Sequence, residues 1–423
     1  MNKVALVDCN NFYCSVERVF NPKLEHRPVV VLSNNDGCII SRSNEAKALG
    51  IKMAEPVYKI MPFLKKNNVA IYSSNYQLYG DMSHRVMTNL SYFVPKIEVY
   101  SIDECFIDLN GFEHQGLINY SQNIKQKIKQ WTGIPVAIGI GNNKVMAKLA
   151  NHIAKKHKGD GVFQLDTLEQ EHSLIKQLDL TEVWGIGRKS ARKLNLLDIH
   201  SVWDFYTAPL AQIKQTMGIN GMQLYYALHN QFHHHFESEQ SDKQSIASSR
   251  SFSTLVKDFQ SLAQALSNYV MIASQKLRKQ NCYTRAIQVY LSTNPFRTNT
   301  PQYHNSINIS LATPSNNTFQ LIHFAKLGLK KIYKKGFEYH KVGVIFVDLS
   351  ANKQLDLLSP LIHSEKENAK QESLMNIIDK INGKMGTDSV FSGAQGIKKH
   401  WLEKRNYLSR KYTTNWNELL QVN

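Results

Sequence analysis

The chain has 423 residues, which is enough for about three domains of a typical ~150 residues each. Lys and Arg number 51 against 34 for Asp and Glu, so the net charge is +17 and favours a polyanionic partner, nucleic acid before a membrane surface. Hydrophobic residues make up 42% and charged residues 20%, a composition that excludes a disordered, collagenous or coiled-coil chain.

Residues 1–165 alternate short β-branched runs with helical patterns, which predicts an α/β or α+β domain around one sheet. The predicted strands are Val4–Val7, Val29–Leu32, Ala70–Tyr72, Ile97–Ile102, Cys105–Leu109 and Val136–Ile140. The predicted helices are Phe12–Phe20, Asn44–Leu49, Tyr76–Phe93, Asn119–Trp131 and Lys144–His157. Only Asp103 and Glu104 separate two of these strands, which predicts a hairpin with both acids at its turn.

The rest of the chain changes character three times. Residues 170–236 lose the strand patterns and predict a small helical domain. The stretch Glu237–Ser249 is polar and has the composition of a linker. Beyond it the patterns follow the order β-α-β-β-α-β up to residue 347, and residues 350–423 become irregular, which predicts a tail.

Positive charge is concentrated after the predicted linker. Residues 250–341 hold 13 Lys and Arg against two acids, Asp258 and Glu338, so this segment carries about two-thirds of the chain's excess charge. Such a segment suits a grip on a phosphate backbone. A solvated basic face that serves solubility is the alternative.

Three carboxylates are predicted to meet at one end of the sheet. Asp8 ends the first strand, and Asp103 and Glu104 occupy the predicted hairpin turn. Crowded acids repel one another unless cations neutralise them, and hard oxygen ligands favour Mg²⁺. Two such ions support nucleotidyl transfer. The alternative is that Asp8 caps a helix and the other two acids make a polar turn.

A glycine turn opens a basic helix in the helical region. Gly185 and Gly187 flank one residue, and Arg188 and Lys189 follow directly. Backbone N–H groups at such a turn can hold a DNA phosphate, although similar turns also serve packing alone.

Five motifs carry a resemblance to a known family. They are Asp8–Tyr13 (DCNNFY), Ser33–Cys38 (SNNDGC), Asn44–Gly50 (NEAKALG), Tyr100–Glu104 (YSIDE) and Gly139–Lys144 (GIGNNK). Together, and in this order, they resemble the Y-family translesion DNA polymerases, nearest to the UmuC branch, which supplies the catalytic subunit of DNA polymerase V. In the tail, Lys398–Trp401 and Leu408–Thr414 resemble the region particular to UmuC-like proteins, so the resemblance covers essentially the whole chain.

The resemblance implies an α+β multidomain fold, the right-hand polymerase with a β-α-β-β-α-β little finger. The implied domains are a palm at 1–11 and 77–168, fingers at 12–76, a helix-hairpin-helix thumb at 169–236, a linker at 237–249, a little finger at 250–347 and a C-terminal tail at 348–423.

The resemblance also implies the site residues. Asp8, Asp103 and Glu104, with the backbone carbonyl of Cys9, match the ligands of two Mg²⁺ ions, and Tyr13 matches the steric gate against a ribose hydroxyl. The implied nucleotide-binding residues are Phe12, Tyr13, Ser41, Asn44, Lys47 and Lys155. The implied DNA-binding residues are Gly185, Gly187, Arg188, Lys189, Arg250, Lys276, Arg278 and Arg285. Without the resemblance, Tyr13 suits a core aromatic and the two lysines suit a solvated surface.

A short peptide in the tail is similar to the sequence with which bacterial polymerases bind the sliding clamp. Its residues are Gln354, Leu355, Asp356, Leu357 and Leu358, and the usual final Phe is replaced by Leu358. Aliphatic anchors on a tether can fill a groove on the clamp, although five residues also match by chance.

The function implied is error-prone, template-directed DNA synthesis without proofreading in the SOS response to DNA damage. The implied partners are primer-template DNA, dNTP, a processed UmuD dimer, RecA and the sliding clamp. Alternatives are a DinB-like polymerase without a UmuD-type subunit, a non-catalytic DNA-binding, clamp-associated factor, and a two-metal nuclease. Five cysteines without a C-x-x-C pair, and no signal peptide or long apolar run, predict a cytoplasmic protein without a membrane. The resemblance further implies a bacterial, nucleoid-associated protein.

Overall fold

The computed structural model describes residues 2–157, 160–232, 236, 242–351 and 365–419. The chain forms two compact units. The first unit comprises Met1–Gln240 and Asn406–Asn423, and the second comprises Ser241–Arg405. The chain therefore leaves the first unit once and returns to it with its last residues.

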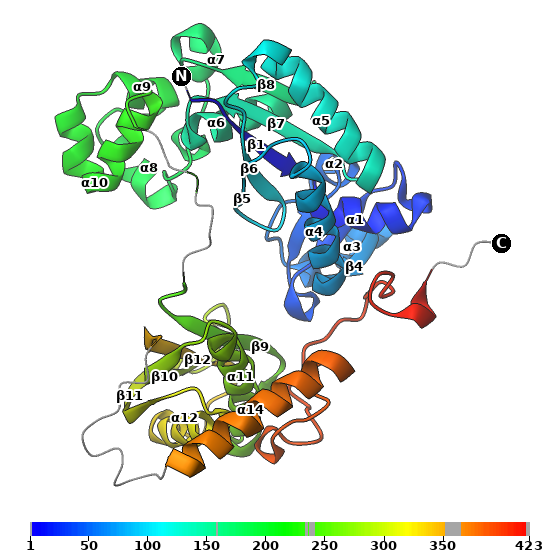
Figure 1. Cartoon of the computed structure of the whole chain (residues 1–423), viewed down its shortest axis with the longest axis vertical. Helices are drawn as coiled ribbons and strands as arrows, with labels where there is room; N and C mark the ends of the chain where they lie inside the picture. Colours follow the sequence, from blue (N-terminus) through cyan, green and yellow to red (C-terminus); the bar gives the residue numbers. More distant parts are fainter. Residues whose placement is uncertain (1, 158–159, 233–235, 237–241, 352–364, 420–423) are drawn as a thin grey trace. The chain divides into compact units, whose positions relative to one another are not determined.

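The first unit is built on a mixed sheet in the order β5-β6-β1-β7-β8 (Figure 1). Its strands are β1 (Val4–Cys9), β5 (Ile97–Val99), β6 (Glu104–Asp108), β7 (Val136–Gly141) and β8 (Val162–Leu165). The helices of the same region are α1 (Phe12–Phe20), α2 (Asn44–Ala48), α3 (Val57–Lys66), α4 (Tyr76–Leu90), α5 (Leu117–Thr132) and α6 (Lys144–Lys156). The expected α+β fold class is confirmed, and α1 has the predicted bounds.

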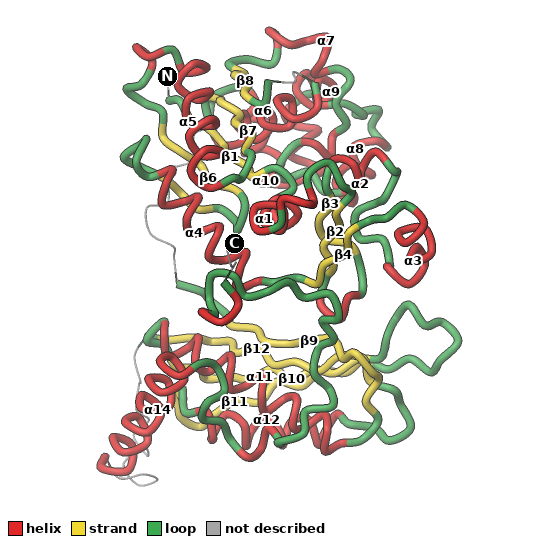
Figure 2. Tube along the Cα trace, turned by 90° about the vertical axis from the view of Figure 1, so that its right-hand side faces the viewer, coloured by secondary structure: helices red, strands yellow, loops and turns green. Residues whose placement is uncertain are grey.

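The prediction of one sheet was wrong, because a second sheet of three strands runs in the order β3-β2-β4 (Figure 2). Its strands are β2 (Val29–Leu32), β3 (Ile39–Arg42) and β4 (Ala70–Ser73). β2 pairs with β3 antiparallel and with β4 parallel, and all four residues of β2 are buried. The burial of both faces of β2 explains its unbroken apolar run, which is typical of a strand in the interior of a sheet.

The two faces of the central sheet pack against different helices. In β1, Ala5, Val7 and Cys9 join a core with α1, α4 and α5, whereas Val4 and Leu6 face α6. Close packing of α6 depends on glycine: a Cβ added to Gly139 on β7 would lie 2.0 Å from a backbone nitrogen of α6. Strand alternation thus decides that Asp8, two residues after Leu6, shares the α6 face.

A group of helices follows the sheet, as predicted. They are α7 (His172–Ile175), α8 (Arg188–Asn195), α9 (Val202–Thr207) and α10 (Leu210–Leu228). Their apolar residues form a core with one side of α6, through Val145, Leu149 and Ile153. The helical group is therefore anchored to the same helix that faces Asp8.

The second unit confirms the predicted element order, with an antiparallel sheet in the order β11-β10-β12-β9. Its elements are β9 (Ile246–Val256), α11 (Phe259–Lys279), β10 (Tyr283–Ser292), β11 (His304–Ser315), α12 (Thr318–Ile332), β12 (Tyr339–Ser350) and α14 (Glu365–Met385). Strand β9 takes the last residues of the predicted linker, and α14 lies where an irregular tail was expected. Among the described residues, no helix is long and apolar enough to span a membrane.

Candidate active site

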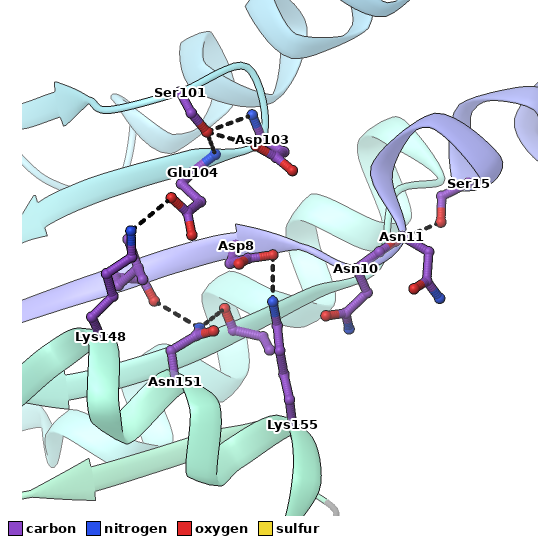
Figure 3. A network of polar contacts seen from close by, with 12 residues as sticks. Asp8, Asn10, Asn11, Ser15, Ser101, Asp103, Glu104, Lys148, Asn151 and Lys155 are labelled. Carbon is purple, nitrogen blue, oxygen red and sulfur yellow. Dashed lines mark hydrogen bonds and ion pairs between the residues drawn. The ribbon is translucent and has the colours of Figure 1, made fainter. Parts of the chain in front are cut away.

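Asp8 and Glu104 are direct neighbours on adjacent antiparallel strands. The register pairs Asp8 on β1 with Glu104 on β6. By alternation, Asp8 shares the sheet face of Leu6 and Glu104 shares that of Phe106, and both apolar side chains belong to the cluster that faces α6. Figure 3 shows the two carboxylates on this face, with Asp103 beside them.

Asp103 is held by the connection between β5 and β6, which is longer than the predicted turn. β5 ends at Val99 and β6 begins with Glu104, so only Asp103 of the two acids lies in the connection. The Ser101 hydroxyl donates to Asp103 Oδ1 at 2.6 Å and accepts from the backbone N–H of Glu104 at 3.0 Å. The Cys9 N–H donates to the Asp103 carbonyl at 2.8 Å, which ties this connection to the end of β1.

Two lysines of α6 face the carboxylates (Figure 3). Lys155 Nζ lies 2.5 Å from Asp8 Oδ1, and Lys148 Nζ lies 3.1 Å from Glu104 Oε2. Lys148 Nζ also lies 4.3 Å from the centre of the Tyr100 ring, a cation–π distance. The sequence prediction included Lys155 and missed Lys148, although a spacing of seven places both on one helix face.

Burial dominates the electrostatics of Asp8. Loss of hydration raises the pKa of Asp8 to about 6, the ion pair with Lys155 opposes this, and Glu104 and Asp103 add to it. Within the described part of the chain, no three His, Cys, Asp or Glu side chains are arranged to hold a metal ion. The ammonium groups of Lys155 and Lys148 contact oxygens of Asp8 and Glu104. The donor set itself, hard oxygens from adjacent strands, suits Mg²⁺.

Tyr13 lies at the start of α1, half-buried against α4. Its ring stacks on Tyr79 with centroids 4.4 Å apart and meets the edge of Tyr76 at 6.2 Å. Burial, with smaller contributions from Tyr76 and Asp103, raises the pKa of Tyr13 to about 12. Phe12, predicted beside it as a nucleotide contact, is 3% exposed and belongs to the core.

A second polar group lies around Asn11, a residue that was not among the predicted site residues. Lys47 Nζ donates to Asn11 Oδ1 at 2.5 Å, and Asn11 Nδ2 donates to Asn44 Oδ1 at 2.9 Å. The Ser41 hydroxyl lies 3.5 Å from the Asn11 carbonyl. Asn11 has a φ of 50°, a left-handed conformation that asparagine tolerates, and it thereby joins three predicted residues.

A cavity of about 290 Å³ opens beside the carboxylates. Asp8 and Glu104 line it from the sheet, Lys148 and Lys155 from α6, and Trp184 from the helical group. Four of these five residues are the charged groups described above, and the fifth is Trp184. The cavity is therefore a polar recess with both signs of charge on its walls.

The predicted DNA contacts near the glycine turn are all exposed. Gly185 has a φ of 104°, a conformation that favours glycine, and Gly187 is the residue before α8. Arg188 and Lys189 begin α8, and Ile186 between the glycines is buried at 3% exposure. Burial of Ile186 fixes the turn while the basic residues face solvent.

The four predicted contacts of the second unit differ from one another. Arg250 pairs with Glu403 at 2.8 Å, and Lys276 is exposed on α11. Arg285 lies on β10 with intermediate exposure. Arg278 is 9% exposed and forms two hydrogen bonds to Asp379, at 2.7 and 2.9 Å. We therefore assign Arg278 to the packing of α14 and omit it from the DNA contacts.

The clamp-like peptide Gln354, Leu355, Leu357 and Leu358 lies outside the described residues.

Four family models match the chain in sequence. The impB/mucB/samB family matches residues 7–152, its C-terminal domain matches 243–357, and the IMS family HHH motif matches 169–199. A domain of unknown function matches residues 372–422.

Curated relatives are similar over nearly the whole length. Protein UmuC of Salmonella typhimurium is 38% identical, with 99% of each chain covered. Protein ImpB of Salmonella typhimurium is 35% identical, with 98% of each covered. DNA polymerase IV 1 of Bacillus subtilis is 26% identical, with 92% of each covered.

Solved structures show the same fold. The Y-family DNA polymerase chimera Dbh-Dpo4(243-245)-Dbh has a TM-score of 0.66 at 23% identity and covers 83% of this chain and 100% of its own. The insertion ternary complex of Dbh DNA polymerase has a TM-score of 0.54 at 24% identity, with coverage of 83% and 100%. The chain belongs to the impB/mucB/samB family and is a Y-family DNA polymerase of the UmuC type.

Proposed function

We propose that this polymerase carries out error-prone translesion synthesis in the SOS response to DNA damage, by two-metal nucleotidyl transfer without proofreading. One observation carries the catalytic part of the proposal. Asp8 and Glu104 are register partners on one sheet face, next to Asp103 and in reach of the lysines of α6. Unshielded carboxylates so close together need cationic partners.

Asp8, Asp103 and Glu104, with the Cys9 carbonyl, would hold two Mg²⁺ ions. With Mg²⁺ bound, the primer 3′-hydroxyl becomes a better nucleophile and the charge that develops on the α-phosphate is offset. Lys155 and Lys148 form ion pairs with Asp8 and Glu104, at 2.5 and 3.1 Å. Release of Lys155 from Asp8 would free its ammonium group for the triphosphate.

The remaining nucleotide contacts would come from the polar group around Asn11 and from the ring of Tyr13. Lys47, Ser41 and Asn44, joined through Asn11, would contact the triphosphate. The ring of Tyr13, half-buried and stacked on Tyr79, would meet C2′ of the incoming sugar and exclude a ribose hydroxyl. An aromatic ring that the core holds in place suits a steric gate, because it cannot move aside at low cost.

DNA binding would be shared by two parts of the chain. In the thumb (169–236), the turn at Gly185 and Gly187 with Arg188 and Lys189 would hold a phosphate. In the little finger (250–347), Arg250, Lys276 and Arg285 would contact the backbone. The palm would comprise 1–11 and 77–168 and the fingers 12–76, with a tail from residue 348.

The partners and the setting are proposed from the similarity to Protein UmuC. They are a processed UmuD dimer, RecA and the sliding clamp, the last bound through residues 354–358. The bacterial relatives favour action on chromosomal DNA in the cytoplasm.

Primer extension on undamaged and abasic templates tests the proposal. Wild type and Asp103→Ala/Glu104→Ala are compared with Mg²⁺ and dNTPs, with and without a UmuD-type partner, RecA filament and clamp. We expect extension past the lesion by wild type and loss of at least about a thousandfold in the double variant. DNA binding by the double variant serves as the folding control.

The same experiment distinguishes the alternatives. Full activity of the purified chain alone would favour a DinB-like polymerase that needs no UmuD-type subunit. Shortening of the DNA without dNTPs would indicate a nuclease. Binding without extension under every condition would indicate a non-catalytic, clamp-associated factor.

A further inference from the structure

The last residues of the chain return to the first unit and pair with the start of α4 and the end of β4. We call residues 406–412 the return segment. Ser73 N–H donates to the Tyr407 carbonyl at 2.9 Å, and Tyr407 N–H donates to the Ser73 hydroxyl oxygen at 3.0 Å. The Asn406 N–H donates to Asp36 Oδ2 at 2.8 Å, and Asp36 Oδ1 accepts from the Ser73 hydroxyl at 2.5 Å. These reciprocal bonds fix the register of the segment.

A buried asparagine continues the attachment. Asn75, 4% exposed, donates from Nδ2 to Ser409 Oγ at 3.1 Å and to the Arg410 carbonyl at 3.3 Å. Its Oδ1 accepts from the backbone of α4 and caps that helix. The ring of Tyr412 stacks on Phe20 of α1, with centroids 4.9 Å apart. The return segment thus contacts α1 and the residue that caps α4. The two helices lie side by side (Figure 2).

One of these contacts leads to Tyr13. Glu17 on α1 is 1% exposed, and its Oε1 accepts from the Ser409 hydroxyl at 3.0 Å and from the Tyr79 hydroxyl at 2.7 Å. Tyr79 is fully buried, and its ring stacks on Tyr13. The two hydroxyls share one carboxylate oxygen between α1 and α4, and Ser409 is the donor that the return segment supplies.

We propose that the return segment positions the sugar-selecting residue: Ser409, through Glu17 and Tyr79, holds the ring of Tyr13 against the core. The inference rests on the proposed role of Tyr13. The return segment lies within residues 372–422, which match a domain of unknown function, so the inference assigns a role to part of that domain.

The physical reason lies in the burial of Glu17. A carboxylate without water is stabilised by the donors that reach it, so loss of one donor shifts the balance between side-chain conformations. Without the Ser409 hydroxyl, Glu17 keeps its hydrogen bond from Tyr79 but is no longer held by the return segment. The Glu17 side chain and the Tyr79 ring can then move together. Ser409, Glu17 and Tyr79 are positioning residues, because none of them is expected to touch the nucleotide.

The test measures discrimination between dNTP and rNTP, as the ratio of kcat/KM values, in the full chain with whatever partners wild type needs for extension. Ser409→Ala is expected to lower the ratio at least about threefold, because a hydrogen bond to the buried carboxyl group of Glu17 is lost. Ser91→Ala is the matched control, because the exposed Ser91 hydroxyl also donates one hydrogen bond within the first unit, to Thr88. It should leave the ratio unchanged.

Two variants of Glu17 test the relay itself. Glu17→Gln keeps an acceptor oxygen for both hydroxyls and should preserve discrimination. Glu17→Ala removes that oxygen and should lower discrimination at least as much as Ser409→Ala. Thermal unfolding of each variant shows whether the first unit is folded at the assay temperature. Equal ratios in wild type, Ser409→Ala and Glu17→Ala, all folded, would overturn the inference.

Tyr13→Ala separates failure of the relay from failure of the gate. If Tyr13→Ala lowers discrimination and Ser409→Ala does not, the gate stands and the relay is wrong. If Tyr13→Ala has no effect, the proposed role of Tyr13 is wrong. In the Tyr13→Ala background, Ser409→Ala should have no further effect on the ratio. If the role of Ser409 were purely structural, Ser409→Ala would lower overall activity in both backgrounds and leave the dNTP/rNTP ratio unchanged in both.

Discussion

The ring of Tyr13 lies nearly parallel to that of Tyr79, with centroids 4.4 Å apart and planes inclined by 16°. Tyr79 is fully buried, while Tyr13 keeps intermediate exposure. The two interpretations of Tyr13 in the sequence, core aromatic and steric gate, are therefore compatible, because the buried ring supports the partly exposed one.

Replacement of Tyr13 by Ala should admit ribonucleotides. We expect the ratio of kcat/KM for dNTP over rNTP to fall about tenfold or more, because the steric conflict with the 2′-hydroxyl disappears. Single-nucleotide insertion kinetics measure the ratio. Tyr92→Ala is the control, since Tyr92 is 74% exposed, and it should behave as wild type. Unchanged selectivity in Tyr13→Ala would remove the gate assignment.

The two lysines of α6 should have different kinetic effects. Lys155→Ala is expected to raise KM for dNTP about tenfold, because one charge-assisted contact to the triphosphate is lost. Lys148 pairs with Glu104 and lies 4.3 Å from the centre of the Tyr100 ring, so we expect it to hold Glu104 in position. Lys148→Ala should therefore lower kcat and leave KM for dNTP nearly unchanged. Steady-state kinetics on one primer-template distinguish the two, and identical changes in both variants would contradict this division.

The stability of the first unit should depend on pH through Glu17. Burial raises the pKa of Glu17 to about 7, while hydrogen bonds from Tyr79 and Ser409 oppose the shift. A raised carboxyl pKa means that the folded state holds a proton that the unfolded state releases. The contribution of Glu17 to the free energy of unfolding is therefore fully present below about pH 4.5 and is lost as pH rises through about 7.

Glu17→Gln should remove this dependence. At pH 5 the variant and wild type should unfold at similar denaturant concentrations, whereas at pH 8 the variant should be more stable by up to about 3 kcal/mol. Chemical denaturation at both pH values, followed by near-UV circular dichroism, measures the difference. If the free energies of unfolding of Glu17→Gln and wild type differ by the same amount at pH 5 and pH 8, Glu17 does not titrate in this way.

Gly139→Ala should strongly destabilise the first unit. The added Cβ would lie 2.0 Å from the Asn151 backbone nitrogen and 2.4 Å from the Ala147 carbonyl oxygen, so α6 must move away from β7. We expect a loss of about 3 kcal/mol or more. Gly80→Ala is the matched control: nothing lies within 4 Å of its added Cβ, and it should stabilise α4 by up to about 1 kcal/mol. Thermal unfolding measures both changes, and equal effects would contradict the packing argument.

The clamp-like peptide gives a prediction that is independent of the active site. Leu355→Ala with Leu357→Ala should reduce clamp-stimulated synthesis about tenfold, because two apolar anchors are lost. Synthesis without the clamp should be unchanged. Surface plasmon resonance with immobilised clamp measures binding directly, and equal binding by both proteins would defeat the assignment.

Local patterns in the sequence determined many of the elements. Continuous β-branched runs predicted β1 and β2, helical periodicity gave the bounds of α1, and alternation with helical stretches gave the element order of the second unit. The acids at the ends of two strands were also visible, because strand ends follow from the same patterns. Each of these signals depends on residues that are near one another in the chain.

The tertiary structure decided what joins distant residues. The separate sheet of β2, β3 and β4 and the link from Lys47 through Asn11 to Asn44 have no periodic signal. Helical spacing places Lys148 on the face of Lys155, but it does not identify Glu104 as its partner. The contact between Ser409 and Glu17 spans nearly the whole chain. A hydrogen bond between distant residues leaves no pattern in either segment, because only the packing of the elements between them brings the two groups within 3 Å of each other.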